Sequence, residues 1–339
     1  MYKSLIFCAA AAAFFIVVLG AFVRLSDAGL GCPDWPGCYG RLTVPQRAQD
    51  VARAQEKFPR QPVQKKKAWI EMAHRYAASA LGVLILLLAA MAWRGRGEPG
   101  QSPWLPTLLV AVVVAQGLLG MWTVTLLLRP AVVTLHLLGG MTTFALLIWL
   151  ALRQSASFAD RRIMPTSALR RWAWLGLGAL VLQISLGGWV SANYAALACP
   201  ELPFCSSSGL GNMDFETAYQ LVRPLGATTA GAALSSEALV AIHWSHRVGA
   251  LVVFLVLGSL SLRLLVAGGM RLYGWALCAA LGLQIGLGLS VVHFALPLPL
   301  AVAHNGGAAL LLATMVVLLT RLHARPQGIL NGSSFPASA

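Results

Sequence analysis

Eight stretches of this chain are long and apolar enough to cross a lipid bilayer, and no other feature restricts its fold as much. A spanning helix needs about 20 predominantly apolar residues, because each adds about 1.5 Å across a hydrocarbon core of about 30 Å. The composition, with 58% hydrophobic and 11% charged residues, likewise indicates an all-α membrane protein. The predicted transmembrane helices cover residues 4–23, 69–93, 105–128, 131–152, 172–192, 239–262, 273–295 and 302–320.

Basic residues predict the orientation of these helices. In short loops Lys and Arg mark the cytoplasmic side of a membrane, and here they gather on the side of the N-terminus, so both termini are predicted to be cytoplasmic. The outer loop 24–68, with nine basic residues, is the exception. Segment 4–23 follows Lys3 and has a cleaved signal peptide as its alternative, but its C-terminal flank is echoed after the fifth segment, which cannot be a signal.

The two halves of the chain repeat one another. With four spans in each half, both halves enter the membrane from the same side, so the symmetry axis runs along the membrane normal. We therefore predict two pseudo-symmetric four-helix bundles, a tandem parallel repeat. The matching residues are Gly20 and Gly187, Cys32 and Cys199, Cys38 and Cys205, Glu71 and His243, His74 and His246, Gln116 and Gln284, Gly120 and Gly288, and His136 and His304.

The repeat divides the chain into a small number of predicted parts. These are an N-terminal bundle at 1–152 with outer loop 24–68, a cytoplasmic linker at 153–171, a C-terminal bundle at 172–325 with outer loop 193–238, and a flexible tail at 326–339.

Four histidines recur at matched positions near the outer ends of even-numbered spans: His74, His136, His246 and His304. Paired neutral imidazoles on facing helices of a bundle can hold a haem iron or another metal. A single buried histidine is more often simply hydrogen-bonded to a neighbour, but the recurrence favours two ligand sites. Glycine pairs follow two of the histidines, at 139–140 and 306–307, where they can leave room for a flat macrocycle, permit close helix packing, or do both.

Charged residues beside the histidines differ between the halves. Arg75 and Arg247 each follow a candidate ligand, and they either extend to the membrane interface or meet haem propionates. Glu71 lies one turn outward from His74 on the same helix face, where it could relay protons or stabilise a cation. Its alternative role is an interfacial ion pair with Arg75 or a loop lysine. Because the second half has His243 instead, we expect the first bundle to react and the second to hold a permanent cofactor.

Two cysteine pairs, Cys32 with Cys38 and Cys199 with Cys205, fall in the predicted outer loops, which face an oxidising compartment in a bacterial-type membrane. They are either structural disulfides that restrain long loops or redox-active pairs. The first pair is the better candidate for activity, because its loop is tight, aromatic and joined to the half that carries Glu71. No Cys-x-x-Cys or nearby histidine supports zinc.

Together these motifs resemble the haem A synthase family, over essentially all of residues 1–325. The resemblance implies an eight-span oxidoreductase that converts the C8 methyl group of haem O to a formyl group, giving haem A for haem-copper terminal oxidases. It implies haem b between His246 and His304, substrate haem O between His74 and His136, and a functional role for Glu71 and the first cysteine pair. The motifs are Leu30-Gly31-Cys32-Pro33-Asp34-Trp35-Pro36-x-Cys38, Glu71-x-x-His74-Arg75, Thr134-Leu135-His136-Leu137, His246-Arg247 and Ala303-His304.

The implied route is oxidation to a C8 alcohol, then to a geminal diol, then loss of water. We hypothesise that water supplies the oxygen, that Glu71 steadies a cation or accepts its proton, and that electrons leave through the haem held by His246 and His304. Expected partners are haem O, haem O synthase, oxidase assembly factors and an unidentified membrane electron acceptor, and a homo-oligomer is compatible with the sequence. The expected location is a bacterial inner membrane, with the haem sites near its outer face.

Other classes of protein explain the same residues less completely. A diheme b-type electron carrier would share the four histidines but has no use for Glu71 or the Cys32 loop. A thiol oxidoreductase would leave the histidines unexplained, and a transporter lacks the expected broken helix or midplane charge. The net charge of +14 does not indicate nucleic acid as a partner, because no basic stripe with interleaved aromatic residues occurs.

Overall fold

A computed structural model describes residues 1–98, 102–155, 166–202, 205, 212–221 and 234–323. Within these ranges the chain is helical and contains no strand, and eight helices are long and apolar enough to cross a membrane. The eight predicted spans are thus confirmed as helices. They are α1 (Tyr2–Leu25), α3 (Lys65–Arg94), α4 (Trp104–Thr125), α5 (Pro130–Arg153), α6 (Ser167–Ala192), α8 (Ser236–Val266), α9 (Arg271–His293) and α10 (Leu298–His323), accompanied by the short helices α2 (Ala48–Lys57), η2 (Ala195–Leu197) and α7 (Phe215–Ala218).

Several helices extend past the apolar segments that predicted them. Helix α3 begins at Lys65, within the predicted outer loop, and α8 begins at Ser236. Composition marks only the part of a helix that lies in hydrocarbon, whereas backbone hydrogen bonding continues into polar turns. Ser235 caps α8 by accepting a hydrogen bond from the backbone N–H of Ala238, which satisfies one of the free donors at the helix start.

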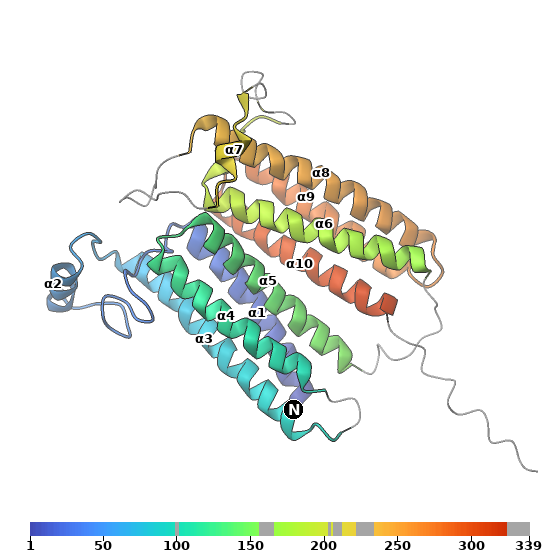
Figure 1. The fold of residues 1–339 in the computed structure, drawn as a ribbon, viewed down its shortest axis with the longest axis horizontal. Helices are drawn as coiled ribbons and strands as arrows, with labels where there is room; N and C mark the ends of the chain where they lie inside the picture. The colour runs from blue at the N-terminus through green and yellow to red at the C-terminus, as the bar shows by residue number, and fades with distance from the viewer. Residues whose placement is uncertain (99–101, 156–165, 203–204, 206–211, 222–233, 324–339) are drawn as a thin grey trace, which may run out of the picture.

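The helices form two groups of four, which Figure 1 shows side by side. In the first group α1 packs on α3, α3 on α4, α4 on α5, and α5 on α1; in the second, α6, α8, α9 and α10 follow the same order. Helices α3 and α5 are therefore diagonal in their group, as are α8 and α10. Diagonal helices face each other across the middle of a group, so side chains on both can reach a common centre.

The two groups meet through their inner helices, with contacts of α10 to α1 and α5, and of α5 to α6. At one end of this contact Arg24 donates to the backbone oxygen of Ser191 at 2.5 Å and lies 4.1 Å over the ring of Tyr194. The Tyr194 hydroxyl donates to Asp27 at 3.3 Å. One continuous apolar core runs through both groups, so the groups are packed together rather than merely tethered.

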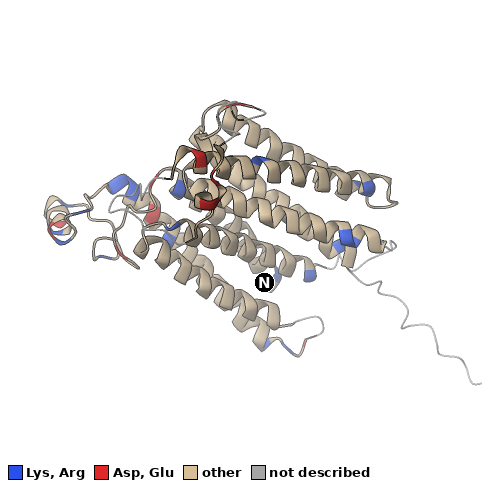
Figure 2. Cartoon of the chain, turned by 45° about the horizontal axis from the view of Figure 1, so that its top comes forward, with Lys and Arg blue, Asp and Glu red and all other residues tan. Residues whose placement is uncertain are grey.

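Large apolar side chains remain exposed along the outer faces of the groups, for example Phe15, Val83 and Leu262. In a bilayer these faces meet lipid, so their exposure is the expected state of a membrane protein. Figure 2 shows that charged residues lie mainly at the helix ends and around α2, away from the middles of the helices. The predicted tail 326–339 lies outside the described residues, as do parts of the linker 153–171 and of the loop 193–238.

Candidate functional site

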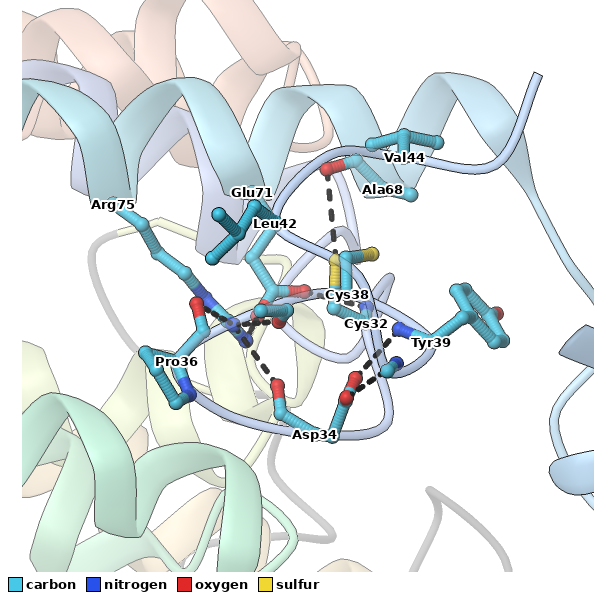
Figure 3. The surroundings of a disulfide bond; sticks show 12 residues. Cys32, Asp34, Pro36, Cys38, Tyr39, Leu42, Val44, Ala68, Glu71 and Arg75 are labelled. Carbon is cyan, nitrogen blue, oxygen red and sulfur yellow. Dashed lines mark hydrogen bonds and ion pairs between the residues drawn. A yellow bond between two sulfur atoms is a disulfide. The ribbon is translucent and has the colours of Figure 1, made fainter.

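The first cysteine pair closes a compact loop over the start of α3 (Figure 3). Cys32 and Cys38 are fully buried and disulfide-bonded, with an S–S distance of 2.02 Å. The carboxylate of Asp34 accepts hydrogen bonds from the backbone N–H groups of Tyr39 and Gly40, each at 2.6 Å. The loop is thus held by its own hydrogen bonds in addition to the disulfide.

Glu71 and Arg75 bind this loop to α3 (Figure 3). The Arg75 guanidinium donates to the backbone oxygens of Asp34 at 2.9 Å, Pro36 at 3.3 Å and Gly37 at 2.6 Å, and forms an ion pair with Glu71. Glu71, only 4% exposed, also accepts a hydrogen bond from the backbone N–H of Cys32 at 2.9 Å. The predicted Glu71–Arg75 ion pair is present and is buried under the loop.

Tyr39 completes the underside of the loop. Its hydroxyl donates to the backbone oxygen of Pro62 at 3.2 Å, and its ring packs edge-on against Phe58. Burial, with the negative charges of Glu71 and Asp34, raises the pKa of the Tyr39 phenol above its ordinary value of 10.0. The phenol therefore remains a protonated hydrogen-bond donor at neutral pH.

The second cysteine pair has a similar relation to Arg247. Cys199 and Cys205 are disulfide-bonded, and Arg247 donates to the backbone oxygens of Cys199 and, at 2.7 Å, of Glu201. Both predicted disulfides are therefore present. Both arginines contact the cysteine loops, while their binding of haem propionates stays a prediction.

Each of the four candidate ligands packs against a glycine of the preceding spanning helix. A Cβ atom at Gly20 would lie 3.0 Å from Cε1 of the His74 ring, and one at Gly288 would lie 3.0 Å from Cε1 of His304. Gly120 with His136, at 3.3 Å, and Gly187 with His246, at 3.1 Å, complete the set. The repeat predicted these four glycines as matched positions, but sequence alone did not show that they support the imidazole rings.

The glycines that follow the histidines have a different neighbour. A Cβ at Gly139 would overlap the side chain of Gln116, and a Cβ at Gly307 would overlap that of Gln284. These glycines permit close packing of helices, which is one of their two predicted roles. The other role, room for a macrocycle, is compatible with this packing and stays a prediction.

The two histidines of each half project from diagonal helices: His74 from α3 and His136 from α5, His246 from α8 and His304 from α10. Within each pair the two imidazoles are close enough for a charge on one ring to affect the other. The Nδ1 atoms of three of these rings are buried and make no hydrogen bond to the described residues within standard distances. A buried polar atom without a partner is unusual, and it indicates that the pairs serve a group the chain itself does not supply.

The number of donors indicates which group fits. Among the described residues no cluster of three or more His, Cys, Asp or Glu side chains could hold a metal ion. Protein sites for bare zinc use three or four such donors, whereas haem iron already has four porphyrin nitrogens and takes one or two from the protein. Paired imidazoles across a four-helix group therefore fit haem.

The position matched to Glu71 carries a different contact in the second half. His243 is buried and lies close to the backbone of Ala195, in the connection after α6. Of the remaining histidines, His293 ends α9 and contacts Phe294, and His323 ends α10 and contacts Trp174.

Comparison with known proteins agrees with this reading. The family model described as COX15-CtaA, cytochrome oxidase assembly protein, matches residues 3–316. The chain belongs to this family. A haem A synthase of Shewanella oneidensis is 42% identical over 307 residues, which cover 89% of this chain and 91% of that protein. The chain is also similar to haem A synthases of two other bacteria. That of Caulobacter vibrioides is 29% identical with 94% of each chain covered, and that of Halalkalibacterium halodurans is 27% identical with 90% of this chain and 93% of the relative covered.

Proposed function

We propose that this COX15-CtaA member is a haem A synthase, an oxidoreductase that converts the C8 methyl group of haem O to a formyl group during cytochrome oxidase assembly. The observation that carries the proposal is a pair of histidines on diagonal helices in each group, with a buried glutamate beside only one pair. The names of relatives up to 42% identical support it.

The asymmetry assigns the two sites. We infer that the group formed by residues 1–152 binds substrate haem O between His74 and His136, because Glu71 lies one turn from His74. The group formed by residues 172–325 would hold haem b between His246 and His304. The matched glycine and histidine contacts support an origin by duplication, with reaction and cofactor binding divided between the copies.

The overall reaction removes four electrons and four protons: a methyl group and one water give a formyl group, through an alcohol and a geminal diol. Haem b, when bound, supplies one-electron redox chemistry that no side chain offers. Glu71 presents its Oε1 to Arg75 and its Oε2 to the backbone N–H of Cys32. These contacts orient the carboxylate, which we propose steadies a cation at C8 or accepts the proton released there.

The disulfide has a supporting part in this proposal. Both sulfur atoms are fully buried, and the loop they close supplies the N–H group that Glu71 accepts from. We therefore propose that Cys32 and Cys38 act by positioning Glu71, and their direct participation in catalysis stays a prediction.

The location follows the distribution of charge. Arginines collect at the ends of α3, α5, α8 and α10, opposite the ends that carry the cysteine loops. We propose cytoplasmic termini in a bacterial inner membrane, with both haem sites near the outer face. Haem O synthase and oxidase assembly factors are proposed partners, and the electron acceptor would be a membrane component.

Production of haem A tests the function. The full chain is expressed with a haem O synthase in cells that otherwise make no haem A, and extracted pigments are identified by mass. Haem A or its C8 alcohol precursor is expected, and both should vanish in a His74→Ala/His136→Ala variant. Two bound haems with unaltered haem O would instead identify a diheme electron carrier.

A further inference from the structure

Three glutamines accompany three of the four candidate ligands in the same arrangement. Each stands four residues before the glycine that supports an imidazole, and each faces a second glycine three residues after the histidine. The three sets are Gln116, Gly120, His136 and Gly139; Gln183, Gly187, His246 and Gly249; and Gln284, Gly288, His304 and Gly307.

These glutamine side chains reach the histidines across a helix boundary. Gln116 Nε2 donates to the backbone oxygen of His136 at 2.9 Å, and Gln183 Nε2 donates to that of His246 at 2.9 Å. Gln183 Nε2 also lies 3.0 Å from Nδ1 of the His246 ring, and Gln284 Nε2 lies 3.4 Å from Nε2 of His304. A Cβ at Gly139, Gly249 or Gly307 would overlap the glutamine, so glycine and glutamine are required together.

His74 lacks this arrangement. Helix α1 has Ile16 four residues before Gly20, and α3 has Ala77 three residues after His74. Only the supporting glycine remains. The polar contacts of this part of α3 are made instead by Glu71, one turn before His74, and by Arg75, which follows it, and both hold the cysteine loop.

We propose that Gln116, Gln183 and Gln284 are positioning residues that fix three histidines, and that His74 is the exchangeable ligand of the first group. The inference rests on the proposed function, because it assumes a haem at each histidine pair. An interhelical hydrogen bond inside a membrane resists displacement of the helix that accepts it. A site with two anchored ligands retains its haem, whereas a site with one anchored and one exchangeable ligand can admit a substrate and release a product.

Carbon monoxide provides the probe, because it binds reduced haem only after one axial histidine leaves. The first group is measured alone in a His246→Ala/His304→Ala variant, and the second alone in His74→Ala/His136→Ala. We expect carbon monoxide to bind the first group at least about tenfold faster than the second, the difference that one interhelical hydrogen bond would produce. The haem-to-protein ratio is determined first, so that a chain without haem, which would overturn the proposed function as well, is recognised separately.

Two sets of variants test the anchors themselves. Ile16→Gln/Ala77→Gly supplies the missing pair and should slow carbon monoxide binding to the first group by about tenfold. Gln183→Leu should speed binding to the second group by a similar factor, while Ser185→Ala, whose hydroxyl bonds only within α6 to Val181, should not. Equal rates in the two groups, or a Gln183→Leu rate equal to wild type, would overturn the inference even if haem A is still produced.

Discussion

The two four-helix groups place the same pair of histidines on the same pair of diagonal helices, yet one turn further out they differ. In the first group Glu71 binds Arg75 and the backbone of the disulfide loop; in the second, the buried His243 lies close to the backbone of Ala195. Both residues lie where a histidine-bearing helix meets a connection, but only Glu71 brings a carboxylate. A pair of histidines is thus retained in both groups while the neighbouring position differs in its chemistry.

The strongest test of this difference is removal of the carboxylate. Glu71→Ala should lower haem A yield by about a hundredfold or more, the usual effect of losing a positioned acid or base, while both haems remain bound. Yield and haem content are measured on the same membranes. His243→Ala serves as the matched control and should lower yield far less. Full haem A yield from Glu71→Ala would remove Glu71 from the reaction.

The supporting glycines test whether the two sites are independent. Gly20→Val adds atoms where even a Cβ would lie 3.0 Å from the His74 ring, so we expect haem affinity in the first group to fall at least about tenfold through overpacking. Gly187→Val should do the same in the second group only. Haem-to-protein ratios and low-spin haem spectra report each loss. Simultaneous loss of both haems from either variant would contradict two independent sites.

Arg75 tests the connection between loop and helix. Arg75→Lys retains the charge but loses the planar fork that reaches three backbone oxygens. We expect haem A yield to fall by about tenfold, the cost of about one charged hydrogen bond, and the disulfide to be reduced and alkylated faster. The matched variant Arg247→Lys should make the Cys199–Cys205 disulfide easier to reduce and alkylate, without a comparable loss of haem A yield. An unchanged alkylation rate in Arg75→Lys would show that the loop does not depend on Arg75.

The smallest expected effect concerns the loop alone. Asp34→Asn weakens two backbone hydrogen bonds of 2.6 Å and should cost about 1 kcal/mol of stability, seen as a lower melting temperature in detergent. Asp50→Asn, which breaks an exposed pair with Arg41, should cost less than about 0.5 kcal/mol. A larger shift for Asp50→Asn would show that the α2 region, rather than the loop, limits stability.

The sequence predicted the helices well and their side-chain partners poorly. Eight spans follow from hydrophobic length alone, because lipid leaves few alternatives to helix. The pairing of Cys32 with Cys38 follows from their closeness in one loop, whereas the membrane depth of His74 stays a prediction. The contact of His74 with Gly20 could not be predicted, because it depends on which helices are neighbours. The repeat matched Gln116 with Gln284 but not Gln183, and it did not predict their contacts, because the sequence of an apolar helix does not show which residue a glutamine will contact.

The order of helices around each group also places one histidine of each pair at the contact between the groups and the other on an outward-facing helix. His136 and His304 stand on α5 and α10, which pack against each other where the groups meet, whereas α3, α4, α8 and α9 face outward. For the proposed enzyme, charge would pass between the sites over a single helix contact. The opposite flank of the first group lies next to His74 and under the disulfide loop. A large, apolar haem could enter from the bilayer, and return to it, on this side.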